Sequence, residues 1–137
     1  MENGRITGLL PFTLLKGYYK MSGIVFLGTN NLDEITEFYH NKIGCKIWME
    51  QADCKIFQHG NFLLGFCERK DCETNGIITF FFSDKKEVDK FYEKFKSLAE
   101  APPIENEKYE IYHFFIHDPE GRKVEFQYFN NLVDTPA

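Results

Sequence analysis

The sequence has no cluster of Lys and Arg, no long apolar run and no Cys-x-x-Cys pair. Its formal net charge of −5 argues against nucleic acid as a partner, because phosphate binding requires clustered cationic side chains. No run approaches the roughly 20 apolar residues of a transmembrane helix, so no membrane partner is expected. The first residues lack a basic start, and Pro11 interrupts their apolar run, unlike a secretory signal. These absences predict a cytoplasmic protein.

The cysteines allow two interpretations, namely disulfides in a secreted protein or small apolar side chains in a reduced cytoplasm. The lack of a Cys-x-x-Cys pair favours the second, as does the position of three of them in or beside expected strands. Cys67 and Cys72 have no second pair at a suitable spacing, which argues against a zinc site. The four residues are Cys45, Cys54, Cys67 and Cys72.

Aromatic residues are abundant. The chain has 137 residues, the size of one domain, and contains 15 Phe, 7 Tyr and 1 Trp. This is more aromatic material than one core of this size needs, so we expect some of the rings to line a cavity.

The hydrophobic pattern predicts one β-α-β-β-β unit in the first half of the chain. Strands are expected at 24–29, 45–49, 54–58 and 62–66. Between the first two strands, Asn31 begins a helix that ends at Gly44.

The same unit recurs after the polar linker at 67–76. Strands are expected at 77–82, weakly at 104–108, and in a hairpin of 110–117 and 122–129, with a helix that begins at Asp84. One spacing separates Ile24 from Ile77, Asn31 from Asp84, and Phe38 from Phe91. The repeated spacing indicates a duplicated unit, since one such half-sheet cannot bury its own face.

Two segments resemble the glyoxalase/bleomycin resistance/dioxygenase superfamily, also called the vicinal-oxygen-chelate fold. Residues 117–126 (HDPEGRKVEF) are similar to its closing hairpin, and residues 30–48 are similar to its first helix and the strand that follows. The resemblance covers roughly 22–130. It implies an α+β fold in which two βαβββ modules, about 22–66 and 77–129, form a half-open mixed sheet barrel around a concave cavity.

The closing hairpin has a predicted register. Asp-Pro-Glu-Gly suits a type I turn followed by a left-handed Gly121, which places Phe115 opposite Glu125 and His113 opposite Gln127. One face of the hairpin is then entirely apolar or aromatic and must lie under the helices. The other face, with His113 and Glu125, is expected to line the cavity.

The resemblance also implies four metal-ligand positions, which we assign to Ile24, Leu64, Ile77 and Glu125 by matching Gly60 with Gly121. One carboxylate and three aliphatic side chains do not hold a catalytic divalent ion, which needs about three protein ligands. We expect no stoichiometric metal and no other cofactor. A divalent metal in a shifted or domain-swapped site that recruits His113 or His59 is the open alternative.

The candidate site combines two side chains that can transfer protons with a largely aromatic lining. Glu125 is the candidate acid or base, and His113 is positioned to polarise a bond or to carry protons. Period-two alternation predicts further cavity residues, which would bind a ligand. These residues are Phe26, Phe62, Leu64, Phe66, Thr79, Phe81, Phe115 and Gln127.

Three functions remain open. The first is a metal-free protein that binds a small aromatic or cationic molecule, and the second is a lyase or isomerase that uses Glu125 as acid or base. The third is a protein whose role lies in contacts with other proteins and whose cavity is vestigial. In that case Glu125 and His113 have no ligand to orient. A homodimer is expected because a single chain would leave aromatic surface exposed.

The termini lie outside the expected domain of 21–130. Residues 1–20 are an extension for which two interpretations are open, a start codon assigned upstream of Met21 or an apolar segment that packs on the sheet or on a partner. Residues 131–137 form a short C-terminal tail.

Overall fold

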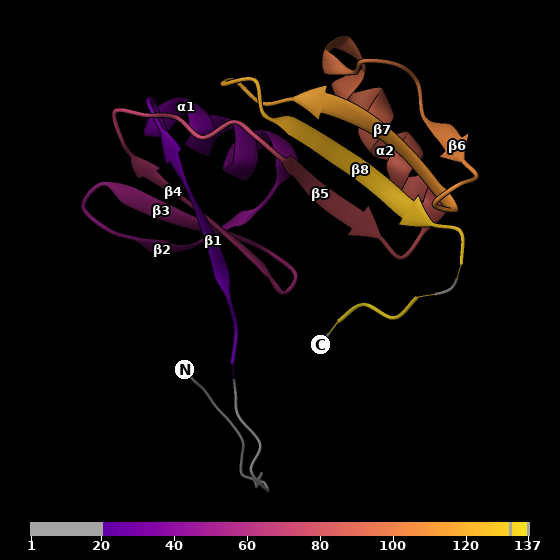
Figure 1. Ribbon diagram of the computed structural model, residues 1–137, viewed down its shortest axis with the longest axis horizontal. Coiled ribbons are helices and arrows are strands. Elements are labelled where there is room, and N and C mark those ends of the chain that lie inside the picture. The colour runs from indigo at the N-terminus through magenta and orange to yellow at the C-terminus, as the bar shows by residue number, and fades with distance from the viewer. Residues whose placement is uncertain (1–20, 132, 137) are drawn as a thin grey trace, which may run out of the picture.

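The computed structural model describes residues 21–131 and 133–136, and it contains two βαβββ modules (Figure 1). The expected extension over 1–20 lies outside the described residues. Module 1 consists of β1 (Ile24–Thr29), α1 (Leu32–Thr36), the π-helical η1 (Glu37–Ile43), β2 (Lys46–Glu50), β3 (Cys54–His59) and β4 (Phe62–Glu68). Module 2 consists of β5 (Ile77–Phe82), α2 (Lys85–Phe95), the 3-10 turn η2 (Lys96–Leu98), β6 (Ile104–Asn106), β7 (Ile111–His117) and β8 (Lys123–Phe129).

The helices begin where the sequence predicts. The Asn31 side chain accepts a hydrogen bond from the backbone N–H of Glu34 at 3.1 Å, and Asp84 accepts one from Lys86 at 2.9 Å. Gly44, with φ of 100°, ends the first helix in the left-handed conformation that glycine adopts without a Cβ clash. No helix in the described part of the chain combines the length and apolar character needed to cross a membrane.

Each module forms its own four-stranded mixed sheet, and the sheets do not close into a barrel. The strand orders are β1-β4-β3-β2 and β5-β8-β7-β6. In both sheets the first and last strands of the module are parallel neighbours, and the other pairs are antiparallel. The two modules therefore repeat one topology.

The two hairpins that close the modules differ in length. In module 2, Phe115 pairs with Glu125 and His113 with Gln127, which confirms the predicted register. Asp118 N–H donates to the Arg122 carbonyl at 2.9 Å, and Gly121 has φ of 89°.

In module 1, His59 pairs directly with Phe62, so that only two residues form the turn. The match between Gly60 and Gly121 is therefore wrong. The parallel pairs of β1 with β4 and of β5 with β8 make Gly65 the counterpart of Glu125.

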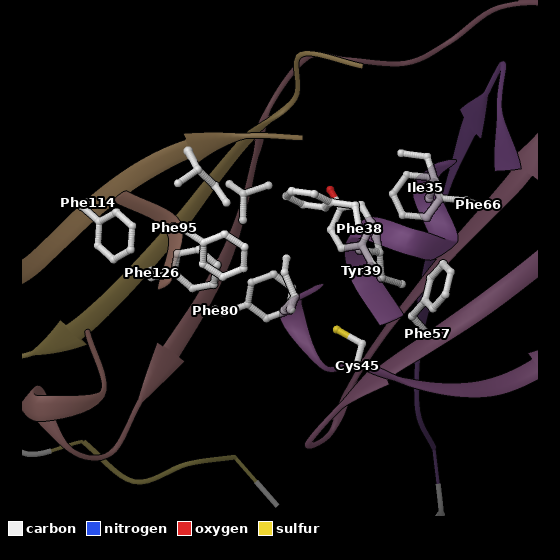
Figure 2. Packing of buried hydrophobic residues seen from close by; sticks show 14 of the residues in the cluster. Ile35, Phe38, Tyr39, Cys45, Phe57, Phe66, Phe80, Phe95, Phe114 and Phe126 are labelled. Carbon is white, nitrogen blue, oxygen red and sulfur yellow. The ribbon is translucent and has the colours of Figure 1, made fainter. Parts of the chain in front are cut away.

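A single aromatic core connects the modules (Figure 2). Phe38 from module 1 lies 6.4 Å from Phe95 of module 2 between ring centroids, and Phe62 lies 5.8 Å from Phe80. The helix-covered faces of both sheets share this core, and no helix of the described residues covers the opposite face of either sheet. These two uncovered faces are called open face 1 and open face 2 below.

Candidate functional site

Open face 2 carries a buried His–Glu pair. His113 on β7 and Glu125 on β8 are 9% and 8% exposed, and His113 Nδ1 lies 2.6 Å from Glu125 Oε2. The pair is diagonal across adjacent antiparallel strands, where side chains on one face reach each other. The strand register thus brings together the two residues that were predicted from the sequence to act as acid, base or proton carrier.

Both oxygens of Glu125 are occupied. Thr79 on β5 donates its hydroxyl to Oε1 at 2.8 Å, and the Gln127 amide, in the orientation that satisfies its hydrogen bonds, donates to Oε2 at 3.0 Å. Among the described residues no hydrogen bond reaches Nε2 of His113. The carboxylate is therefore the group that orients the ring, and the imidazole is the group left available for a ligand.

A cavity of about 590 Å³ surrounds this pair. Such a volume is typical of sites for small molecules. Its walls are mostly apolar. The lining residues besides the pair are Ile77, Asn106, Tyr109, Ile111, Phe115, Gln127 and Phe129.

Aromatic and cationic groups meet at one wall of this cavity. His113 contacts Phe115 edge-on, with ring centroids 5.1 Å apart. The Lys123 ammonium lies 4.3 Å from the centroid of the Phe115 ring. The face of the Phe115 ring is thus available for cation–π contacts, and the Lys123 ammonium makes one.

Two further predicted cavity residues, Thr79 and Phe81, lie on open face 2 but do not line the cavity of about 590 Å³. Thr79 bonds Glu125, and Phe81 packs on Phe129 with ring centroids 5.3 Å apart.

Three predicted cavity residues are on the wrong face. Leu64 and Phe66 belong to the aromatic core, with Phe66 5.1 Å from Tyr39 between ring centroids, and Phe62 packs against the same core. The cause is the two-residue turn, because a register slip of one residue moves every side chain of a strand to the other face.

Phe26 lies on open face 1, apart from the His–Glu pair. It covers Gly65, where an added Cβ would lie only 2.4 Å from the Phe26 ring. It lines a separate cavity of about 750 Å³ that contains only residues of module 1 and of the linker that follows it. Within one chain, therefore, Phe26 and Glu125 do not share a site.

The cavity of about 750 Å³ on open face 1 is lined in part by a disulfide between Cys54 and Cys67. The two residues are directly opposite on β3 and β4, with Cα atoms 4.0 Å apart. The prediction that all four cysteines are reduced is therefore wrong. Cys45 and Cys72 are free, and burial raises the pKa of the Cys45 thiol to about 12.

The residues at the four metal positions do not fit a divalent ion. With the observed pairing these positions are Ile24, Gly65, Ile77 and Glu125, which still provide a single carboxylate. Within residues 21–131 and 133–136 no three His, Cys, Asp or Glu side chains lie close enough together to hold a metal.

Several lining residues were missed from the sequence. Ile111 and Phe129 continue the alternation of His113 and Gln127 along the same strands, so the predicted register already contained them. Tyr109 lies in the loop before β7, where no periodicity exists to indicate its direction.

Comparison with known proteins identifies the fold. No protein-family model matches the chain, and no curated protein matches it in sequence. A glyoxalase/bleomycin resistance protein/dioxygenase from Alicyclobacillus acidocaldarius is similar in structure at 22% identity, with 81% of this chain and 92% of that chain covered and a TM-score of 0.65. A lactoylglutathione lyase from Agrobacterium tumefaciens is similar at 21% identity, with 84% and 97% covered and a TM-score of 0.66.

An integron cassette protein from Halifax Harbour sewage outfall is similar at 18% identity, with 80% of this chain and 99% of that chain covered and a TM-score of 0.68. At such identities the similarity is one of fold, and it confirms the fold implied by the hairpin and first-helix segments. The chain has the two-module fold of the glyoxalase/bleomycin resistance/dioxygenase proteins.

Proposed function

We propose that the protein binds a small aromatic or cationic molecule, without a metal, in the cavity on open face 2. The observation that carries this proposal is the His113–Glu125 pair, buried in an otherwise apolar cavity of about 590 Å³. A buried carboxylate is costly unless it is paired, and here Thr79, His113 and Gln127 hold it in place. Fixed polar groups in an apolar cavity orient a ligand.

A lyase or isomerase activity is the second candidate, supported by the free Nε2 of His113. A carboxylate behind an imidazole fixes the orientation of the ring and stabilises its protonated form, so that the ring accepts a proton from a bound substrate. Glu125 would then act through His113 rather than touch the substrate. The two candidates differ in whether a ligand found by thermal-shift screening is converted.

Glu125→Gln is expected to weaken the binding of such a ligand, or to lower its turnover, by more than twofold. The change keeps the shape of the side chain and removes the charge that holds His113. Isothermal titration calorimetry or a product assay measures the effect.

Glu100→Gln is the matched control, since Glu100 lies outside the cavity, where it pairs with His117 and Lys123. Equal affinities of wild type and Glu125→Gln would contradict the site assignment and would favour a vestigial cavity.

We also propose that the protein is a homodimer whose second copy covers open face 2. Among the strands of the described residues, β1 and β5 each pair on one side only. Val25, Phe26 and Ile77 are 54%, 49% and 54% exposed. Exposed apolar edge strands are sites of association between chains. Open face 1 of one copy would then bring Phe26 to the cavity of the other. A cytoplasmic location stays a prediction.

Val25→Glu is expected to shift the dimer toward monomer, because a carboxylate on the unpaired edge would be buried in the contact. Light scattering at micromolar concentration measures the state. Leu98→Glu, at an exposed apolar residue of η2, is the control and should leave the dimer intact. A wild-type chain that remains monomeric at these concentrations would refute the dimer.

A further inference from the structure

A third cavity lies between the modules, next to the His–Glu cavity. It has a volume of about 510 Å³ and is bounded by the β3–β4 turn on one side and by β5 on the other. Phe62 from module 1 and Phe80, Phe81 and Phe82 from module 2 line it. The two cavities share no lining residue, but they are neighbours, since Thr79 in this lining donates its hydroxyl to Glu125 at 2.8 Å.

The walls of this intermodule cavity carry no formal charge. Its lining contains no Asp, Glu, Lys or Arg, and the one side chain that titrates near neutral pH is His59. Burial lowers the pKa of His59, which keeps the ring neutral at pH 7. The polar side-chain groups that remain are those of Asn61, Thr79, Ser83 and Thr135 and the ring nitrogens of His59. An occupant of matching chemistry is uncharged, because an ion would lose its hydration without gaining a counter-charge.

The C-terminal tail crosses the rim of the cavity. Thr135 and Pro136 contribute to the lining, and the Asn61 side-chain amide donates a hydrogen bond to the Pro136 carbonyl. All residues of 133–136 are exposed. Within the described part of the chain, this is the only hydrogen bond that holds the tail. A segment attached in this way opens at small free-energy cost.

We propose that the intermodule cavity is a binding site for a small, uncharged aromatic molecule and that the C-terminal tail is a displaceable strap over it. The phenylalanine rings provide stacking and edge contacts to a planar ligand. The amide and hydroxyl groups at the rim fix its orientation. This site adjoins the His–Glu cavity through Thr79, but its proposed ligand does not require a ligand in that cavity.

The neutral fluorophore N-phenyl-1-naphthylamine tests the proposal in fluorescence titrations of the full chain. We expect saturable binding of one molecule per chain. Ending the chain at Asn131, or changing Asn61→Ala, removes the strap contact and should each tighten binding by about two- to tenfold, the value of one hydrogen bond. The two changes combined should have no larger effect than either alone, because both act on one contact.

Two further arms locate the probe. Phe62→Leu keeps an apolar side chain of similar size and removes the ring, so it should weaken binding by about two- to tenfold. The matched change Phe115→Leu reports on binding in the His–Glu cavity, and it should weaken the binding of this probe less than Phe62→Leu does. The anionic analogue 8-anilinonaphthalene-1-sulfonate should bind at least about tenfold more weakly, because no lining cation compensates its charge.

Each of four outcomes would overturn the proposal. They are an absence of saturable binding, a loss of affinity in Phe115→Leu instead of Phe62→Leu, equal affinity for the anionic analogue, and an affinity that neither tail variant changes.

Discussion

Replacement of Arg122 by methionine is expected to lower the free energy of unfolding by about 3–5 kcal/mol, because it leaves the buried Asp118 and the partly buried Glu120 without their counter-charge. Arg122 is 2% exposed, and its guanidinium lies 3.0 Å from Asp118 and 2.8 Å from Glu120. It also donates to the backbone carbonyls of Gly28 and Glu73, both at 2.6 Å.

The two carboxylates have further roles that depend on Arg122. Asp118 accepts a hydrogen bond from the Tyr39 hydroxyl at 2.8 Å, and Glu120 accepts one from Thr29 at 2.7 Å. Burial, followed by contact with Asp118, raises the pKa of Tyr39 well above its usual value, so Tyr39 remains a donor. The guanidinium also lies 5.0 Å from the centroid of the Phe66 ring.

Chemical denaturation of wild type and Arg122→Met measures the loss, and Arg69→Met is the matched control. Arg69 forms an exposed ion pair with Asp53 at 3.3 Å, and such pairs contribute about 0–1 kcal/mol. Equal losses in the two variants would show that the buried cluster around Arg122 contributes nothing beyond a surface pair.

The difference between wild type and Arg122→Met should shrink in acid. Burial acts to raise the pKa of Glu120, but hydrogen bonds from Thr29, Arg122 and Asn30 outweigh it and lower the pKa. A lowered pKa means that the stabilisation is present above the ordinary value and is lost as the pH falls through the folded-state value. Below the ordinary pKa of 4.5, therefore, Arg122 contributes progressively less.

Removal of the Cys54–Cys67 disulfide should cost about 3 kcal/mol, the value for a closed loop of about 15 residues. The bond joins adjacent strands with a sequence separation of 13. The double change Cys54→Ala and Cys67→Ala should lower the melting temperature, and a reducing agent should lower that of wild type in the same direction. The double variant should not respond to the reductant, whereas Cys72→Ala should respond like wild type.

Thiol counting under denaturing conditions provides the independent measurement. Two free thiols per chain are expected, from Cys45 and Cys72. Four free thiols in the folded protein as isolated would contradict the disulfide.

The sequence was sufficient to predict the two modules and the register of the closing hairpin of module 2. Asp-Pro-Glu-Gly determines one turn, and that turn placed His113, Phe115 and Glu125 on the same face. The predicted register of the first hairpin is wrong, because it makes Gly60 the counterpart of Gly121 although the two turns differ in length. With a two-residue turn at Gly60, the same counting puts Leu64 in the core.

The same two-residue turn places Cys54 opposite Cys67. The incorrect turn length therefore explains two errors, the face assigned to β4 and the absence of a disulfide from the prediction. The separation of Phe26 from Glu125 is a different case. It depends on how the modules pack through pairs such as Phe38 and Phe95, which are far apart in sequence and carry no local pattern.

The Arg122 cluster has a consequence for how the chain folds. Its partners come from β1, from the linker and from the β7–β8 turn, so the cluster forms only when both modules are in place. Tyr39 adds a contact from η1 to the same turn. A half-chain that contained only one repeat would lack these partners and would expose its side of the aromatic core. Although the sequence is a duplication, its two copies have become a single cooperative folding unit.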